Sequence, residues 1–209
     1  MLKQSGFILF IVFGVSKAIA QKVVEKQLDA SRFERLSISS DIVNTLTINS
    51  QETDQIRIVT KVVGENHENV MLTISEDKTT LNVGTSYTPY FTPENDKLSA
   101  HKVMSVALEF IVPNFIDLEL SASMGSVNLT GNYRSVEVYL ENGNCQLNNF
   151  LGNAIIKTHE GDIWVAAQEH VSGRAFSKNG KVLNYLPGSA IYSIVAESLH
   201  GDISMLQTK

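Results

Sequence analysis

Carboxylates and one arginine recur at equivalent positions in the C-terminal half of the chain, in a pattern that could support glycoside chemistry. Glu119, Glu137 and Arg174 each lie six residues before a glycine. In a stack of repeated strands they would share one outer face, where paired carboxylates can attack a glycosidic bond. Ile155 interrupts this row. A carbohydrate-active enzyme of the β-helix type is therefore the second interpretation of the sequence.

Two histidines, His159 and His200, also precede equivalent glycines and have acidic neighbours. Imidazole and carboxylate groups are competent metal ligands. The two corners are two rungs apart in the predicted stack, about 10 Å, which is too far to share one ion. We expect exposed turn residues here, with no metal site and no cofactor. The sequence also has no phosphate-binding glycine loop and no nucleophile elbow, so we expect no catalysis.

These positions are defined by a glycine-centred turn that recurs every 18 to 21 residues. The glycines are Gly125, Gly143, Gly161, Gly180 and Gly201. Apolar and polar residues alternate before and after each glycine, as expected for half-buried strands. A fixed period of about twenty residues predicts an all-β, single-stranded β-solenoid, or β-helix-like stack, whose rungs bury a shared core. A meander of antiparallel hairpins has the same local signal and is the less favoured alternative.

The single cysteine, Cys145, falls in the second position after its glycine. Val127, Ile163, Val182 and Ile203 occupy the same position in the other repeats. We therefore expect a buried thiol that packs as a small apolar group and is not reactive.

The outward positions hold the candidate binding residues. Trp164 and Leu183 lie three residues after their glycines, and Tyr139 and Phe176 lie four before theirs. Stacked in sequence order, Trp164 and Leu183 would be neighbours, and Tyr139 and Phe176 would flank Lys157. Exposed aromatic side chains on a rigid sheet can stack on a glycan or contact a cell-surface protein.

An alternative is that another segment or a second subunit covers these aromatic side chains. Residues 84–102 contain two prolines and three aromatic residues and are expected to form a long exposed loop, which could supply that cover.

The N-terminus has the pattern of a secretory signal peptide over residues 1–20. An apolar run from Phe7 to Val15 is followed by the small-residue motif Ala18-Ile19-Ala20. An uncleaved anchor is the alternative. No later segment is apolar enough to cross a membrane, so we expect an exported protein in the periplasm, on the outer surface or secreted. The net charge is −5 without a basic cluster, which argues against nucleic-acid binding.

The mature chain is expected to contain two regions that differ in how regularly the strands repeat. A less regular β region covers 21–112 and the regular rungs cover 115–209, in one continuous core with almost no helix. Only four residues follow Met205, so the last rung would have open strand edges and could associate edge to edge with another copy.

The stretch from Leu108 to Val127 resembles the bacterial putative-adhesin family of envelope β-solenoids. It has that family's order of strand, proline, strand and Gly-Ser before an apolar residue, and the resemblance extends from Phe33 to Lys209. The head domain of autotransporter-like adhesins is similar. The resemblance implies an exported bacterial binding protein without a known cofactor, and it assigns no functional residue. A structural or regulatory envelope protein with no external ligand is the third interpretation.

Overall fold

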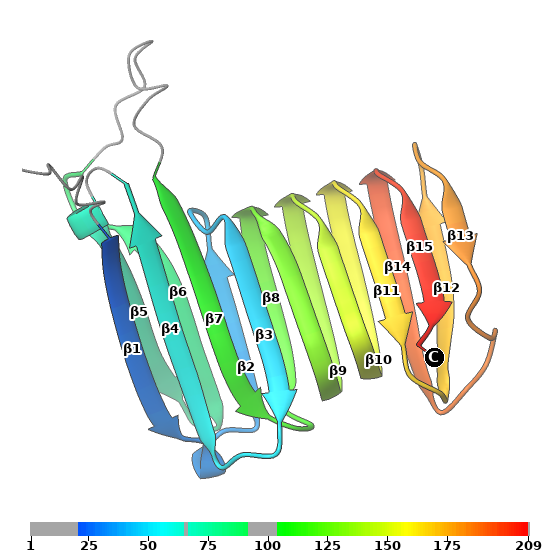
Figure 1. Ribbon diagram of the computed structural model, residues 1–209, viewed down its shortest axis with the longest axis horizontal. Coiled ribbons are helices and arrows are strands. Elements are labelled where there is room, and N and C mark those ends of the chain that lie inside the picture. The colour runs from blue at the N-terminus through cyan, green and yellow to red at the C-terminus, as the bar shows by residue number, and fades with distance from the viewer. Residues whose placement is uncertain (1–20, 65–66, 92–103, 209) are drawn as a thin grey trace, which may run out of the picture.

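The computed structural model describes residues 21–64, 67–91 and 104–208, and the all-β prediction is confirmed (Figure 1). The predicted signal peptide lies outside the described residues, as does the predicted loop from residue 92 onward. Two single-turn 3-10 helices, η1 (Ala30–Arg32) and η2 (His67–Asn69), interrupt the strands. The strands are β1 (Gln21–Asp29), β2 (Arg35–Ser40), β3 (Thr45–Gln51), β4 (Gln55–Val63), β5 (Val70–Asp77), β6 (Thr80–Tyr87), β7 (Ser105–Pro113), β8 (Asp117–Met124), β9 (Ser126–Asn142), β10 (Cys145–Glu160), β11 (Ile163–Ala167), β12 (Val171–Ser177), β13 (Val182–Asn184), β14 (Tyr192–His200) and β15 (Ile203–Gln207).

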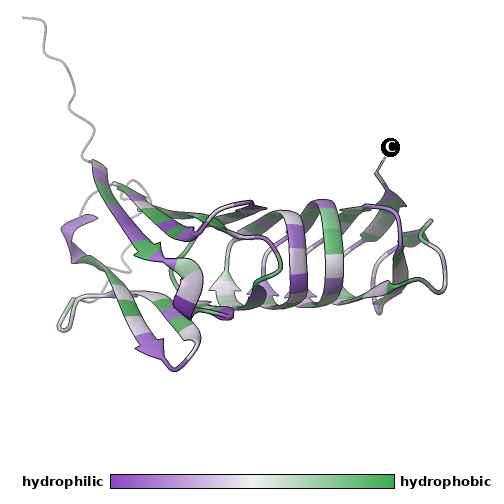
Figure 2. Ribbon diagram, turned by 90° about the horizontal axis from the view of Figure 1, so that it is seen from below, coloured by the Kyte–Doolittle hydropathy of each residue, from purple (hydrophilic) through white to green (hydrophobic). Residues whose placement is uncertain are grey.

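The strands form one 15-stranded mixed sheet that folds into two facing layers (Figure 2). Layer A has the order β1-β4-β7-β3-β9-β10-β11-β15-β13, and layer B has the order β5-β6-β2-β8-β9-β10-β14-β12. The long strands β9 and β10 pass through both layers, the first half of each in layer A and the second half in layer B. Antiparallel pairing is confined to β1–β4, β4–β7 and β5–β6 among the described strands. The remaining pairs are parallel. The connections β3–β4 and β5–β6 stay within one layer, and the other connections between described strands carry the chain from one layer to the other.

The parallel register aligns the apolar positions of successive repeats, as the glycine spacing predicts. Cys145 pairs with Val127 on one side and with Ile163 on the other, and Ile163 pairs with Ile203. Each of these four side chains is 1% exposed, so the prediction of a buried Cys145 is confirmed. Burial raises the pKa of the Cys145 thiol to about 12, because the thiolate loses its hydration in the apolar interior.

The order of the last rungs differs from the order expected from the sequence. Strands β14 and β15, which flank Gly201, lie between the rung of Gly161 and the rung of Gly180 (Figure 1). The physical reason is the composition of β12, whose inward positions are Gly173, Ala175 and Ser177. Such small residues fill a middle layer poorly, whereas Ile194 and Ala196 of β14 are fully buried there. The less apolar rung therefore terminates the stack.

This order changes the end of the molecule. The stack does not end at Met205, as expected, but at β12, β13 and the segment that follows them. Val182 pairs with Ile203 yet is 39% exposed, so its predicted place in a buried column is wrong. Leu186 folds back over the end of the core and is 8% exposed. The end of the stack, which was expected to be open, is thus covered by the apolar side chain of Leu186.

The regular parallel stacking begins before residue 115. Leu36 of β2 pairs with Leu118, and Leu46 of β3 pairs with Val127. The corner between β2 and β3 contains no glycine, which is why the glycine period did not reveal this rung. Apolar residues from both halves of the chain form one buried cluster. Residues Gly84–Tyr87 belong to β6, so the prediction of a loop beginning at 84 is wrong for these four residues.

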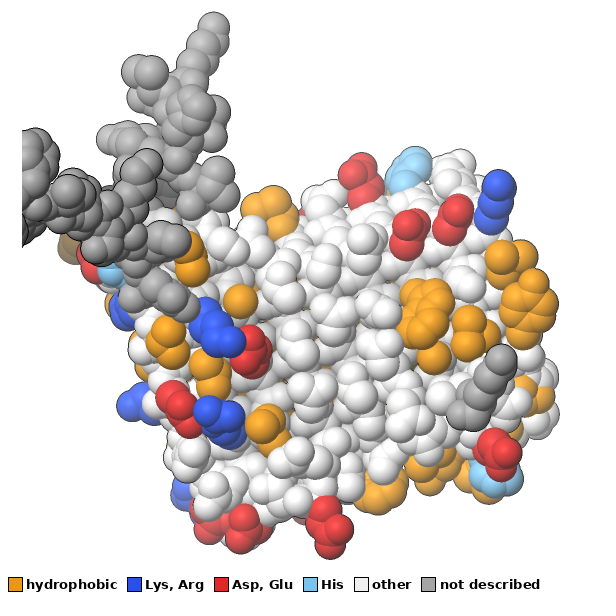
Figure 3. Space-filling model, viewed as in Figure 1, with side chains coloured by type: hydrophobic (Ala, Val, Ile, Leu, Met, Phe, Trp, Pro, Cys, Tyr) orange, Lys and Arg blue, Asp and Glu red, His pale blue; other side chains and the backbone are white. Residues whose placement is uncertain are grey.

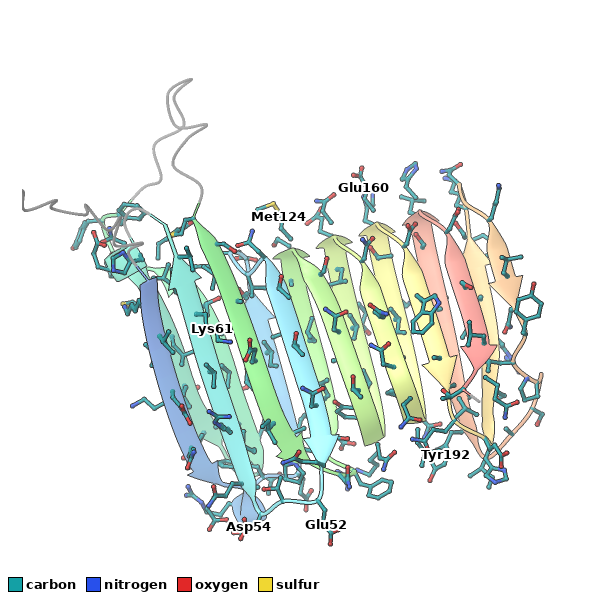
Figure 4. The ribbon with its side chains drawn as sticks, in the orientation of Figure 1. Glu52, Asp54, Lys61, Met124, Glu160 and Tyr192 are labelled. Carbon is teal, nitrogen blue, oxygen red and sulfur yellow. The ribbon has the colours of Figure 1, made fainter. Side chains whose placement is uncertain are left out.

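The glycines of the repeat stack in a column at one edge of the two layers. Met124 and Glu160, which precede two of these glycines, both lie at this edge in Figure 4. A Cβ atom on Gly161 would overlap the carbonyl oxygen of Gly143, and the φ angle of Gly161 is +146°. The corner therefore requires glycine both for close approach and for backbone conformation.

Candidate binding groove

A groove of about 570 Å³ crosses the outer surface of layer B, beside the glycine edge. It extends over five neighbouring strands, β8, β9, β10, β14 and β12. The lining residues are Ser121, Ala122, Ser123, Tyr139, Leu140, Glu141, Lys157, Thr158, His159, Phe176, Lys178, Glu197, Ser198 and Leu199. Two of the four predicted binding residues, Tyr139 and Phe176, are among them.

One row of side chains forms the axis of this groove. Tyr139 pairs with Lys157, Lys157 with Glu197, and Glu197 with Phe176. Tyr139 is 40% exposed and Phe176 is 65% exposed, and three strand spacings, about 14 Å, separate their backbones. The expectation that both aromatic residues flank Lys157 is therefore wrong for Phe176, since Glu197 lies between them.

Two polar contacts orient side chains along this row. Lys157 Nζ lies 3.3 Å from Glu197 Oε2, and the Tyr139 hydroxyl donates to Glu137 Oε2 at 3.3 Å. Both members of the ion pair are close to half exposed, so the pair contributes little to stability. Its polar atoms remain accessible to a ligand in the groove.

Two hydroxyl groups in the floor of the groove bond to the glycine corners. Thr158 donates to the carbonyl oxygen of Gly143 at 3.3 Å, and Ser198 donates to that of Gly161 at 3.1 Å. Both side chains are buried. The groove therefore lies on an ordered backbone that keeps the spacing of the row above it.

A second row of exposed or half-buried groups borders the glycine edge. Glu141, His159 and Lys178 lie two residues after Tyr139, Lys157 and Phe176, and Lys178 directly follows the end of β12. Together with Lys157 and Glu197, they give the groove two lysines, two carboxylates and one histidine. This balanced set can donate and accept hydrogen bonds without favouring a strongly charged ligand.

The other two predicted binding residues lie on layer A. Trp164 pairs with Ser204, and Ser204 pairs with Leu183, so the prediction that Trp164 and Leu183 are neighbours is wrong. Trp164 is partly buried, whereas Leu183 is 53% exposed near the end of the stack. Figure 3 shows hydrophobic side chains gathered on this face toward the C-terminal end. The four predicted residues therefore belong to two separate surfaces.

The changed rung order also brings the two histidines together. The rings of His159 and His200 are 5.9 Å apart between centroids, in an edge-on arrangement, so the expected separation of two rungs is wrong. Asn179 Nδ2 lies 3.3 Å from His200 Nδ1. Within residues 21–64, 67–91 and 104–208, no group of three or more potential metal ligands is present.

The carboxylates proposed for glycoside chemistry are partly adjacent. Glu119 and Glu137 are partners on β8 and β9. Arg174 is three strands away from Glu137, with Ile155 and Val195 between them. The structure thus separates the arginine from the two glutamates.

Sequence reasoning missed Glu197 and Lys178 as groove residues. Glu197 occupies the outward position of the last repeat, and only the exchange of the final two rungs places it beside Lys157. The poor apolar content of β12 was the signal that could have revealed this exchange.

Comparisons with known proteins support the fold. No protein-family model matches the sequence, and no curated protein is a significant match. A solved structure described as a putative cell adhesion protein from Clostridium sporogenes has a TM-score of 0.65 at 16% identity, over 90% of this chain and all of that one. A structure described as a putative adhesin from Bacteroides fragilis has a TM-score of 0.40 at 14% identity, over 88% of this chain and 97% of that one. The first similarity shows a shared fold.

In the described part of the chain, no helix is long and apolar enough to cross a membrane.

Proposed function

We propose that this protein is an exported, adhesin-like binding protein without catalytic activity, and that its parallel rungs form a short β-solenoid. The parallel register and the fold shared with a structure described as a cell adhesion protein support this proposal. The predicted signal peptide supports export. The groove on layer B is the binding surface.

The single observation that carries the proposal is the row Tyr139–Lys157–Glu197–Phe176. An aromatic side chain lies at each end, and an accessible ion pair lies between them. Aromatic faces stack on the apolar faces of sugar rings, while the ammonium and carboxylate groups bond to hydroxyls. Because the charges balance and the aromatic residues are about 14 Å apart, the ligand is a neutral oligosaccharide longer than one sugar unit.

Glycan-array screening followed by titration calorimetry tests this function. Tyr139→Ala should weaken binding by about fivefold to tenfold, because it removes a stacking surface. Trp164→Ala is the matched control, since Trp164 is an aromatic residue on the opposite layer, and it should leave the affinity unchanged. Equal losses in the two variants, or the absence of any glycan ligand, would contradict the proposal.

A carbohydrate-active enzyme is the second candidate, because Glu119 and Glu137 are neighbours on the same face. Hydrolysis of a polysaccharide that Glu137→Gln abolishes, with the fold retained, would establish this activity in place of simple binding.

A further inference from the structure

The last rung of the stack has an unusual combination of charge and exposure. Residues 171–191 contain three cationic side chains and no carboxylate, although the whole protein has a net charge of −5. The three cations, Arg174, Lys178 and Lys181, are all exposed. The same rung contains five of the exposed large apolar side chains: Phe176, Val182, Leu183, Tyr185 and Ile191.

One edge of this rung is open for strand pairing. Among the described strands, β12 pairs only with β14. At Gly173 the other edge is occupied, because its N–H donates to the carbonyl oxygen of Pro187 at 3.1 Å and Asn184 Nδ2 donates to its carbonyl oxygen at 2.8 Å. Backbone groups alternate in direction along a strand, so Ala175 and Ser177 point their N–H and C=O groups to the same side as Gly173. No described strand pairs with them there.

We propose that this edge of β12 binds an extended acidic segment of a partner polypeptide, which adds to layer B as a further strand. The free backbone groups of Ala175 and Ser177 favour a polypeptide over a lipid surface, because a lipid surface cannot satisfy them. The cations favour an acidic partner, and they oppose the self-facing contact of two identical ends. This interaction surface extends beyond the groove proposed for glycans and shares Phe176 and Lys178 with it.

The side chains of β12 specify the sequence of that partner segment. Arg174 and Phe176 of β12, and Lys178 directly after it, lie at every second position and are exposed on the outer face of layer B. Side chains directly opposite one another on paired strands interact, so a well-matched segment presents acidic, apolar and acidic residues at every second position. The chain itself contains this pattern in Glu137, Tyr139 and Glu141 of β9, which occupy the corresponding positions in layer B.

The test uses a fluorescein-labelled octapeptide with the sequence of Ser135–Asn142 and the full-length mature protein. The control peptide has lysine in place of both glutamates. Fluorescence anisotropy should show that the acidic peptide binds about tenfold or more tightly than the control, and the double variant Arg174→Glu/Lys178→Glu should reverse that preference. Equal binding of the two peptides to both proteins would overturn the proposal.

A backbone variant separates strand pairing from simple charge attraction. Ala175→Pro removes an N–H that faces outward and leaves the ladder to β14 intact, as proline is tolerated on an open edge. It should abolish peptide binding, while the circular dichroism spectrum and glycan binding are retained. If it unfolds the protein, the charge-reversal pair decides the question alone. Undiminished peptide binding by folded Ala175→Pro would overturn the proposal. Binding of the parent protein to vesicles of anionic lipid, with no binding to the peptide, would also overturn it. A dimer of the parent protein in sedimentation velocity that Ala175→Pro abolishes would overturn it as well.

Discussion

The side chain of Asp162 accepts a 2.7 Å hydrogen bond from the backbone N–H of Asp202, forty residues later in the sequence. Asn144 accepts in the same way from the N–H of Asp162 at 2.8 Å, and Asp202 accepts from the N–H of Lys181 at 2.7 Å. The residues that follow Gly143, Gly161, Gly201 and Gly180 are thus bonded from one rung to the next. These bonds follow the exchanged order of the rungs, so they help to fix that order at the glycine edge.

Removal of one acceptor should weaken this row of bonds. We expect Asp162→Ala to lower the free energy of unfolding by about 1 kcal/mol, because the N–H of Asp202 loses its partner. Asp162→Asn keeps an acceptor oxygen, as Asn144 does in the preceding rung, and should restore most of that loss. Urea unfolding measures both variants. An Asn variant as unstable as the Ala variant would contradict the role assigned to the bond.

The glycine column gives a larger effect. Gly161→Ala should lower the free energy of unfolding by about 2–4 kcal/mol, because its Cβ would meet the carbonyl oxygen of Gly143 in a backbone conformation that disfavours alanine. Gly188→Ala is the matched control. A Cβ at Gly188 has no neighbour within 4 Å, so the change should be within about 0.5 kcal/mol of zero. Thermal unfolding of the two variants side by side checks the difference.

The buried thiol of Cys145 should lower the stability of the folded protein at alkaline pH. Its pKa is raised to about 12 in the folded protein, whereas an unfolded cysteine has a pKa of about 8.5. The folded state retains the proton that the unfolded state loses, so stability should be fully present below about pH 8.5 and fall as pH rises toward 12. Cys145→Ala should show a shallower fall than the parent over this range. Native protein should also resist alkylation by iodoacetamide at pH 8.5 and react only after unfolding.

The ion pair of Asp117 should stabilise the folded protein at neutral pH and lose this effect in acid. The Arg134 guanidinium donates to both carboxylate oxygens, at 2.9 and 2.6 Å, and with Ser135 it lowers the pKa of Asp117. Because the folded pKa is depressed, this stabilisation is present above the unfolded pKa of about 3.9 and is lost as pH falls through the folded value. Asp117→Asn should therefore be less stable than the parent at pH 7, and the difference should shrink as the pH approaches 2. A pH series of urea midpoints checks this, and a constant difference would contradict it.

The sequence was informative about layers and faces because strand periodicity is local. The alternation around each glycine correctly predicts that Cys145 packs with Val127 and Ile163, since a parallel register follows from equal spacing. The order of the rungs could not be obtained in this way. Any rung can stack on any other with the same backbone bonds, so the order depends on which side chains best fill the middle of the core. That preference is a property of the whole stack and not of a single repeat.

In the candidate groove, too, the sequence predicts which side chains point outward but not which of them are neighbours. Tyr139 and Phe176 could be recognised as outward aromatic residues from their positions in the repeat. Their partners could not, because Glu197 reaches Lys157 only through the exchanged rungs. A single shift in order also moved Trp164 away from Leu183 and brought His159 against His200.

Strands β14 and β15 lie between strands that come earlier in the sequence, and this placement affects how the chain folds. A ribosome completes β12 and β13 before it makes residues 192–207, yet the earlier strands have no partner on the preceding rung until those residues arrive. Strands β12 and β13 therefore cannot join the stack in the order of synthesis, and they must remain unassembled until residues 192–207 have been made. Deletion of residues 192–207 would remove β14 and β15 from between two other rungs and would leave β12 and β13 without their pairing strands.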